Sequence, residues 1–273
     1  MALKYKMVCA DFDSTSTNSK GEVTSRTREA VKKYRDAGGI FLVNTGRSYK
    51  SVVNRLKEIY GGEVRLPLAC LQGGRIFSAD GELIREYNLD KPELIKLVGE
   101  CQKLGVYFQI YSGERLFAER EHEMSVAYME ATGTGQEFVG DMVNFLQGYD
   151  GSADKLLVIS DVESIAKLFK VYEKDASFIN TKFVYSTPFF LEAIPHVSGK
   201  DVALRLFADM YGVTTDEVAA IGDSNNDLPM IKAAGLGVAM GNAVTELKAA
   251  ADLIAEDCDH DGLALFLESI TDV

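Results

Sequence analysis

The stretch Val8-Cys9-Ala10-Asp11-Phe12-Asp13-Ser14-Thr15 is the most informative part of this chain. It begins as an apolar run and ends in acids, which is typical of a buried strand that delivers polar groups at its C-terminal end. Side chains alternate along a strand, so Asp11 and Asp13 point to the same side. Parallel sheets bind ligands at this edge. Two neighbouring carboxylates repel each other unless a cation or a shared proton compensates their negative charge. Mg²⁺ is the cation that we expect here, because it binds carboxylate oxygens.

Strands alternate with helices on both sides of this stretch. A helix is expected from Ser25, its N-cap, to Ala37, where Gly38-Gly39 stops it. Strands are expected at Ile40–Val43 and Leu68–Leu71, with a helix over Tyr49–Tyr60 between them. This alternation predicts βαβ units with right-handed crossovers and a mostly parallel sheet.

The pattern changes at residue 75, where two short runs around Asp80-Gly81 indicate a hairpin that leaves the parallel sheet. Residues 83–187 then hold enough strands and helices to bury a core of their own. Phe189–Pro195 restores the first pattern, and a helix at Lys200–Tyr211 follows it. We therefore predict a doubly wound, mostly parallel α/β core resembling a Rossmann fold, formed by residues 1–82 and 188–273, with an inserted α/β cap at 83–187.

Composition excludes several classes of function. The 273 residues carry a formal net charge of −12, and no basic stripe is visible, which argues against binding to nucleic acid or to anionic membrane surfaces. No apolar stretch is long enough to span a bilayer, and Met1–Cys9 lacks the apolar region of a signal peptide. The four scattered cysteines favour a reduced state. We expect a cytoplasmic monomer or homodimer.

Three further polar sites follow apolar strands at the same edge of the expected sheet. Gly222–Asp227 supplies two more acids, Asp223 and Asp227, about one helical turn apart. Thr45 follows the second strand, and Lys200 begins a helix. Alone, each has an ordinary explanation: acids at strand ends are commonly solvated, Thr45 could cap a helix, and Lys200 could lie on the surface. Their combination in this order favours a shared site.

D-x-D-x-T at Asp11–Thr15, the strand-ending Thr45, the helix-starting Lys200 and G-D-x-x-N-D at Gly222–Asp227 resemble the haloacid dehalogenase superfamily of aspartyl-phosphate phosphatases. The insertion between Thr45 and Lys200 resembles that of its Cof-like subgroup, whose α/β cap lies there. Three departures stand out. Ser14 and Asp201 replace usual glycines, and Gln72-Gly73-Gly74 only approximates the usual Asn-Gly-Ala.

The resemblance implies a role for each matching residue. Asp11 would be the nucleophile that forms an aspartyl-phosphate, and Asp13 the general acid and base. Mg²⁺ would be held by Asp11, by the backbone carbonyl of Asp13 and by Asp223, with Asp227 close by or acting through water. Thr45 and Lys200 would complete the catalytic set by binding the phosphoryl oxygens and neutralising charge. The remaining residues expected to bind phosphate are Phe12, Gly46 and Asn226.

The expected function is hydrolysis of small phosphate monoesters, such as sugar phosphates or related metabolites, with Mg²⁺ as cofactor. Two alternatives stay open: a phosphomutase on the same scaffold, and a non-catalytic regulatory protein that binds a phosphorylated ligand. Candidates for choosing the substrate are Tyr111, Arg115, Arg120 and Lys155 of the cap.

Some nearby residues have two explanations of similar weight. Arg47 and Lys50 could contact the substrate or the cap, or could form a solvated helix face. Cys258-Asp259-His260-Asp261 mixes soft and hard ligand types without a second Cys/His pair, which favours a polar turn over a metal site.

Overall fold

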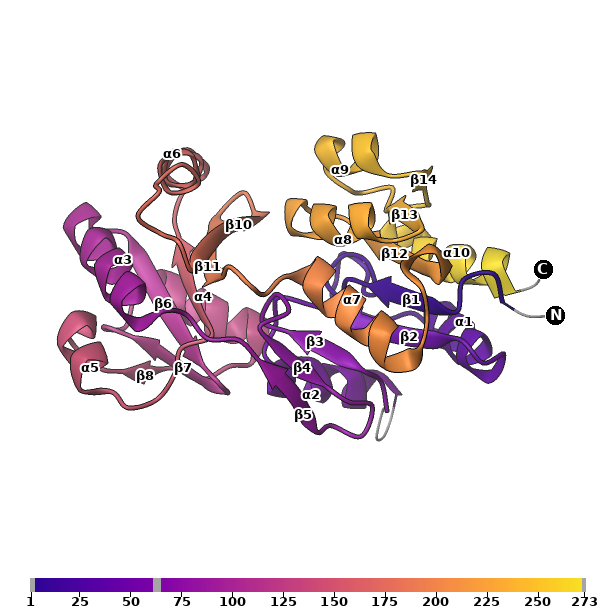
Figure 1. Cartoon of the computed structure of the whole chain (residues 1–273), viewed down its shortest axis with the longest axis horizontal. Helices are drawn as coiled ribbons and strands as arrows, with labels where there is room; N and C mark the ends of the chain where they lie inside the picture. Colours follow the sequence, from indigo (N-terminus) through magenta and orange to yellow (C-terminus); the bar gives the residue numbers. More distant parts are fainter. Residues whose placement is uncertain (1–2, 61–64, 272–273) are drawn as a thin grey trace.

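Two β-sheets and their helices make up the molecule in a computed structural model that describes residues 3–60 and 65–271 (Figure 1). The chain forms part of the larger sheet, crosses to the smaller sheet, and returns to finish the larger one. Residues 1–2, 61–64 and 272–273 of the predicted core ranges lie outside the described residues. Within the described part of the chain, every helix is too short or too polar to cross a bilayer.

The larger sheet has eight strands in the order β14-β13-β12-β1-β2-β3-β4-β5. Neighbours from β14 to β3 are parallel, and β4 and β5 add an antiparallel hairpin at one edge. The central strands are buried along their whole length, because helices cover both faces. The strands are β1 Met7–Ala10, β2 Ile40–Asn44, β3 Leu68–Cys70, β4 Arg75–Phe77, β5 Leu83–Glu86, β12 Val218–Gly222, β13 Leu236–Ala239 and β14 Leu253–Ile254.

Six helices flank this sheet: α1 Ser25–Asp36, α2 Tyr49–Tyr60, α7 Lys200–Tyr211, α8 Leu228–Ala233, α9 Thr245–Ala250 and α10 Gly262–Thr271. The helix α1 packs against α10, and α7 packs against α8, which gives the doubly wound arrangement that the sequence predicted (Figure 1). The N-cap of α1 is Thr24 and not Ser25, because the Thr24 side chain accepts the N–H of Thr27.

The smaller sheet has six strands in the order β10-β11-β9-β6-β7-β8. All its neighbours are antiparallel except β7 and β8. The strands are β6 Tyr107–Ser112, β7 Arg115–Ala118, β8 Glu137–Phe138, β9 Lys155–Ile159, β10 Thr181–Thr187 and β11 Phe190–Pro195. Its helices are α3 Lys91–Leu104, α4 Glu123–Thr132, α5 Met142–Gly148 and α6 Val162–Tyr172.

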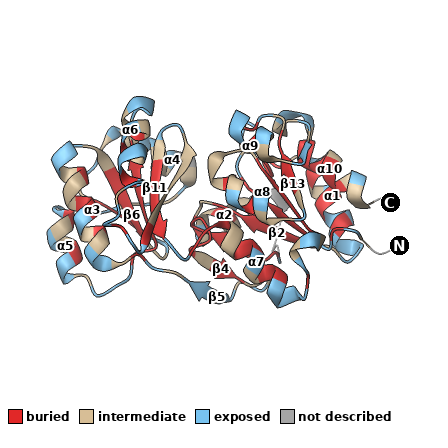
Figure 2. Ribbon diagram, turned by 45° about the horizontal axis from the view of Figure 1, so that its top comes forward, coloured by how far each residue is buried: buried red, intermediate tan, exposed pale blue. Residues whose placement is uncertain are grey.

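Each sheet has a hydrophobic core of its own (Figure 2). The core of the larger sheet includes Val8, Leu42 and Ile221, and that of the smaller sheet includes Leu97, Leu156 and Ile165. The division into domains 1–82 with 188–273 and 83–187 stays a proposal. The chain passes between the two sheets at positions that differ from these boundaries, since β5 belongs to the larger sheet and β11 to the smaller one.

Two further expectations about local structure are wrong. The hairpin at residues 75–87 does not leave the parallel sheet, because Leu68–Cys70 pairs with β4 and extends the sheet. Phe189–Pro195 does not return to the first pattern, since it pairs with β9 and β10 of the smaller sheet. An apolar run carries no information about which sheet supplies its hydrogen-bond partners, so both errors concern pairing and not strand propensity.

Candidate active site

Three carboxylates meet at the C-terminal edge of the larger sheet. Asp11 follows β1, and Asp223 and Asp227 follow the adjacent strand β12. One oxygen of each carboxylate lies within 4.8 Å of the others. The strand order brings these residues together although 212 positions separate Asp11 from Asp223 in the sequence. This is the convergence that the parallel sheet predicted.

Lys200 supplies the positive charge at the cluster. It is the first residue of α7 and only 2% exposed. Its ammonium group donates to Asp11 Oδ1 and lies 2.6 Å from Asp227 Oδ1. Asn44, at the end of β2, donates to the backbone carbonyl of Lys200 at 2.8 Å, which fixes the start of α7 against the sheet. One buried cation therefore serves two buried carboxylates.

Burial and mutual repulsion control the protonation of the acids. Burial raises the pKa of Asp11 well above its usual value; Lys200 opposes this effect, and Asp227 and Asp223 add to it. Burial, together with the charge of Asp227, also raises the pKa of Asp223 to about 7. For Lys200, burial lowers the pKa, but the charges of Asp11 and Asp227 outweigh burial and raise it. Three carboxylates share one ammonium, so a further cation would favour their ionised forms.

Asp227 is held more firmly than the other two acids. Its Oδ2 accepts the backbone N–H groups of Asp223 and Ser224, both at 3.0 Å, and its Oδ1 contacts Lys200. Gly222 allows this arrangement, because a Cβ at that position would lie 2.5 Å from the Asp227 carboxyl carbon. Asp227 is thus an anchor of the loop that carries Asp223.

Asp11 and Asp223 each keep one carboxylate oxygen without a hydrogen bond from any described residue. Asp11 Oδ1 contacts Lys200, and Asp223 Oδ1 accepts the hydroxyl of Thr15 at 2.9 Å, which leaves the Oδ2 atoms. Hard carboxylate oxygens of this kind suit Mg²⁺ better than a soft metal. The donor set therefore fits a hard divalent cation, with Asp11 and Asp223 as its side-chain ligands and Asp227 behind them.

Asp13 lies beside this cluster and pairs with Arg47. The guanidinium group of Arg47 contacts both Asp13 oxygens, with Nε–Oδ2 and Nη2–Oδ1 distances of 2.8 Å. The Asp13 side chain is half-exposed and lines the cavity described below. The ring of Phe12, by contrast, is buried, with the Arg47 guanidinium 5.7 Å from its centroid. The sequence missed this Asp13–Arg47 pair because nothing in the local pattern joins the two positions.

Thr45 and Gly46 follow β2 at the same edge. Thr45 is buried, and its hydroxyl oxygen accepts the N–H of Arg47 at 3.1 Å. Its backbone carbonyl accepts the N–H of Gln72 at 3.0 Å. A Cβ at Gly46 would lie 2.7 Å from the side-chain nitrogen of Gln72, so a larger residue there would displace the Gln72 side chain.

A cavity of about 430 Å³ lies over the acidic cluster, between the two sheets. The larger sheet contributes Asp11, Asp13 and Asp223 to its wall. The smaller sheet and its helices contribute Tyr128, Leu157 and Phe190, as well as the charged residues Lys155 and Glu192. Asn226 also lines the cavity, and its amide nitrogen donates to Gln72 at 3.0 Å.

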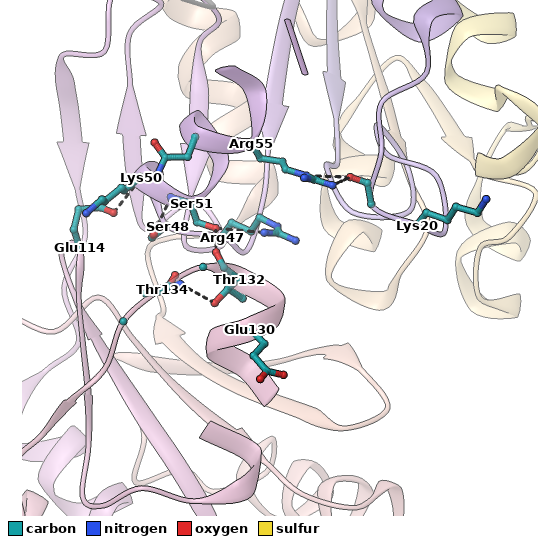
Figure 3. Close-up of a pocket in the computed structure, with 14 residues that line it drawn as sticks. Lys20, Arg47, Ser48, Lys50, Ser51, Arg55, Glu114, Glu130, Thr132 and Thr134 are labelled. Atoms are coloured by element: carbon teal, nitrogen blue, oxygen red, sulfur yellow. Dashed lines mark hydrogen bonds between the residues drawn. The ribbon is translucent and has the colours of Figure 1, made fainter. Parts of the chain in front are cut away.

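A second cavity of about 610 Å³ lies where α2 meets the end of α4 (Figure 3). Arg47 and Thr132 line both cavities. Ser51 donates to the carbonyl of Thr132 at 2.9 Å, and the N–H of Lys50 donates to Glu114 at 2.9 Å. The Lys50 segment thus contacts the part of the chain that carries the smaller sheet. We place the chemistry in the smaller cavity, because Asp11 and Asp223 line it.

The four cap candidates separate into two pairs. Lys155 lines the catalytic cavity, and the buried Tyr111 ring lies 5.0 Å from the Lys155 ammonium. Arg115 pairs with Glu137 on the surface, and Arg120 is exposed, so neither lines the catalytic cavity. Glu192 was missed altogether, and Gln72 was noted only as part of Gln72-Gly73-Gly74, without a role at the site. A signal existed for Glu192 and Lys155, since each is a charge within an otherwise apolar strand.

The residues around Cys258 form a short 3₁₀ turn at Cys258–His260, in which Asp257 accepts the N–H groups of Asp259 and His260. His260 Nδ1 lies 2.7 Å from Asp257 Oδ1 at the surface. This geometry agrees with the polar turn that the sequence favoured.

Comparison with known proteins places nearly the whole chain in one family. The model of the family described as haloacid dehalogenase-like hydrolase matches residues 8–267. The chain is 26% identical over 287 aligned positions to 5-amino-6-(5-phospho-D-ribitylamino)uracil phosphatase YwtE of Bacillus subtilis, with 97% of this chain and 98% of the relative covered. It is 23% identical to phosphatase YwpJ of the same organism, with 97% and 99% covered.

Solved structures have the same fold over nearly the whole chain. A haloacid dehalogenase-like hydrolase from Bacteroides thetaiotaomicron is 28% identical, with a TM-score of 0.81 and coverage of 97% of this chain and 99% of the other. One from B. subtilis is 23% identical, with a TM-score of 0.87 and coverage of 96% and 99%. The likeness includes the smaller sheet as well as the larger one.

Proposed function

The chain belongs to the haloacid dehalogenase-like hydrolase family, and on this basis we propose that it is a Mg²⁺-dependent phosphatase in which Asp11 forms a covalent aspartyl-phosphate. As a phosphoric monoester hydrolase it acts on small phosphorylated substrates. The family also agrees with the Cof-like resemblance found in the sequence. The single observation that carries the mechanism is the contact of one buried ammonium, that of Lys200, with Asp11 and Asp227.

In the first step, a carboxylate oxygen of Asp11 attacks phosphorus and the ester P–O bond breaks. Asp13 gives its proton to the leaving alkoxide, which departs as an alcohol. Lys200 and the hydroxyl of Thr45 stabilise the charge on the phosphoryl oxygens, together with the backbone of Phe12 and Gly46. A Mg²⁺ ion held by Asp11, the Asp13 carbonyl and Asp223 would neutralise charge on the phosphoryl group.

In the second step, Asp13 takes a proton from water, and the resulting hydroxide attacks phosphorus. The bond between phosphorus and Asp11 breaks, which releases inorganic phosphate and restores the carboxylate. Asp13 lines the cavity outside the buried acid cluster, and it would have to release at least one of its contacts with Arg47 to donate or accept the proton. Asn226 and Asp227 act by holding the loop that carries Asp223.

The leaving group would be small and uncharged, as in a sugar phosphate. Glu192, Asp13 and the acid cluster surround the cavity with negative charge that Arg47 and Lys155 offset only in part, so a second phosphate on the substrate would be repelled. One phosphate ester to test is 5-amino-6-(5-phospho-D-ribitylamino)uracil, the compound in the name of the YwtE relative. A screen with Mg²⁺ that measures both released phosphate and isomerised sugar phosphate separates a phosphatase from a phosphomutase.

Asp11→Asn tests the mechanism, because it removes the nucleophilic charge and keeps the shape of the side chain. We expect at least a ~10³-fold loss of phosphate release. Circular dichroism and thermal unfolding give the control, and the folded state should persist. A folded Asp11→Asn variant that turns over at the wild-type rate contradicts the proposed nucleophile.

A further inference from the structure

Lys155 is a charged residue in an unusual place. It is the first residue of β9 in the middle of the smaller sheet, and it is only 2% exposed. A buried ammonium is strongly unfavourable unless other groups compensate its charge and fill its donor positions. Its ammonium lies 2.5 Å from Glu192 Oε2, on the neighbouring strand β11, and faces the Tyr111 ring.

The same ammonium reaches across to the larger sheet. It donates to the backbone carbonyl of Gly46 at 2.9 Å. Gly46 follows Thr45, whose hydroxyl we assign to phosphate binding. A side chain of the smaller sheet therefore fixes the orientation of a peptide group in the loop that carries Thr45.

Glu192 makes a second connection, to the loop of the metal ligands. Its Oε1 accepts the amide of Gln72 at 2.9 Å, and Gln72 Oε1 accepts the amide of Asn226 at 3.0 Å. Asn226 lies in the loop between Asp223 and Asp227. Gln72 is itself constrained, since it has a φ of 60° and its N–H donates to the Thr45 carbonyl.

We propose that Lys155 and Glu192 are positioning residues for the proposed phosphatase reaction. Their buried ion pair, carried entirely by the smaller sheet, orients the Thr45–Gly46 loop directly and the Asp223–Asp227 loop through Gln72. Both loops reach their reactive geometry only while the smaller sheet is seated on the larger one. The proposal rests on the proposed function, because it assigns these loops to phosphate and metal.

The test variants are Lys155→Met, Glu192→Gln and Gln72→Asn. Methionine keeps most of the volume of lysine without its charge, and glutamine does the same for Glu192. Gln72→Asn shortens the connection without leaving a buried charge unpaired, and asparagine tolerates the positive φ at this position. It therefore still gives a readout if either charge-removing variant fails to fold.

We expect each folded variant to lose between about tenfold and a hundredfold in kcat for p-nitrophenyl phosphate with Mg²⁺, because the reacting groups are misplaced. KM should change by less than ~3-fold. Inhibition by vanadate, which mimics the transferring phosphoryl group, should weaken by about the same factor as kcat. A purely structural role would lower stability and leave kcat and the inhibition by vanadate unchanged.

A matched control exists in the same region. Arg75 of β4, whose side chain is 17% exposed, pairs at 2.8 Å with the fully buried Asp154, which precedes Lys155, so this largely buried ion pair also links the two units. It contacts neither catalytic loop, and neither residue lines the cavity. Arg75→Met and Asp154→Asn should lower stability and leave kcat within about twofold.

Two results would overturn the positioning role: unchanged kcat in folded Lys155→Met, Glu192→Gln and Gln72→Asn, or an equal loss of kcat in the Arg75–Asp154 control. Wild-type protein that releases no phosphate from p-nitrophenyl phosphate or from the metabolite screen would instead reject the proposed function.

Discussion

Three residues at the candidate site have a backbone conformation that glycine would adopt more easily. Ser14, Leu71 and Gln72 have φ values of 56°, 50° and 60°. Ser14 stands where the family usually has glycine. Its backbone still adopts the left-handed conformation that glycine favours, so the turn is kept although the residue differs. Strain of this kind persists where surrounding contacts impose it, and Asn242 holds the Ser14 carbonyl at 3.0 Å.

Gly222→Ala is the sharpest test at the residue scale. The new Cβ would lie 2.5 Å from the Asp227 carboxyl carbon, so the loop that carries Asp223 must shift. We expect a loss of about 1–3 kcal/mol in the free energy of unfolding and a clear loss of turnover. Urea unfolding and phosphate release measure the two effects.

Gly99→Ala is the matched control for that substitution. Gly99 lies within α3, and a Cβ there would meet nothing within 4 Å. Alanine should stabilise the protein by roughly 0.5–1 kcal/mol and leave turnover unchanged. If Gly222→Ala also left both stability and turnover unchanged, the close approach to Asp227 would have no functional importance.

At the scale of single elements, three of the four helices described beside the smaller sheet begin at aspartate N-caps, and α4 begins at His122. The side chains of Asp90, Asp141 and Asp161 accept backbone N–H groups of the first turns of α3, α5 and α6. Each cap is a local feature, since the aspartate accepts an N–H only three residues further along the chain. Such caps stabilise a helix without contact to the cavity.

Asp90→Ala should lower the free energy of unfolding by about 1 kcal/mol, because the N–H of Glu93 loses its acceptor. Asp90→Asn retains an acceptor and should cost less. Neither variant should change kcat, since Asp90 does not line the catalytic cavity. A large loss of kcat in Asp90→Ala would show that the stability of α3 is coupled to catalysis.

At the scale of the whole molecule, the ion pair of Lys155 with Glu192 lies within the smaller sheet, and hydrogen bonds to Gly46 and Gln72 connect it to the unit of the larger sheet. Burial raises the pKa of Glu192, but the charge of Lys155 and hydrogen bonds outweigh burial and hold the pKa below its usual value of 4.5. The folded state thus binds a proton at Glu192 less readily than the unfolded state does. The stability gained from this pair is present above pH 4.5 and is lost as the pH falls through the lowered pKa.

We therefore expect the free energy of unfolding of the wild type to fall more steeply below pH 4.5 than that of Lys155→Met/Glu192→Gln. Urea unfolding between pH 3 and pH 7 in both proteins measures the difference. The double variant is the suitable comparison because it leaves no unpaired buried charge. Parallel pH profiles for the two proteins would contradict the stabilising role of this ion pair.

Local pattern in the chain was enough to predict the doubly wound core and the residues of the acid cluster. Asp11, Thr45 and Asp223 each follow a short apolar strand. Because the C-terminal ends of parallel strands lie at one edge of the sheet, the pattern predicts that these residues lie close together. Lys200 could be identified because it starts a helix in the expected order. These features depend on local pattern and on topology rules that hold for any sequence of this kind.

Three features became visible only in the folded molecule: the pairing of β11 with β9, the clamp of Arg47 on Asp13, and the connection from Lys155 and Glu192 through Gln72 to Asn226. Each joins residues that lie far apart in the sequence, and no local pattern identifies which residues will pair. Propensity and periodicity describe neighbours along the chain, whereas the geometry of buried charges depends on which surfaces fold together.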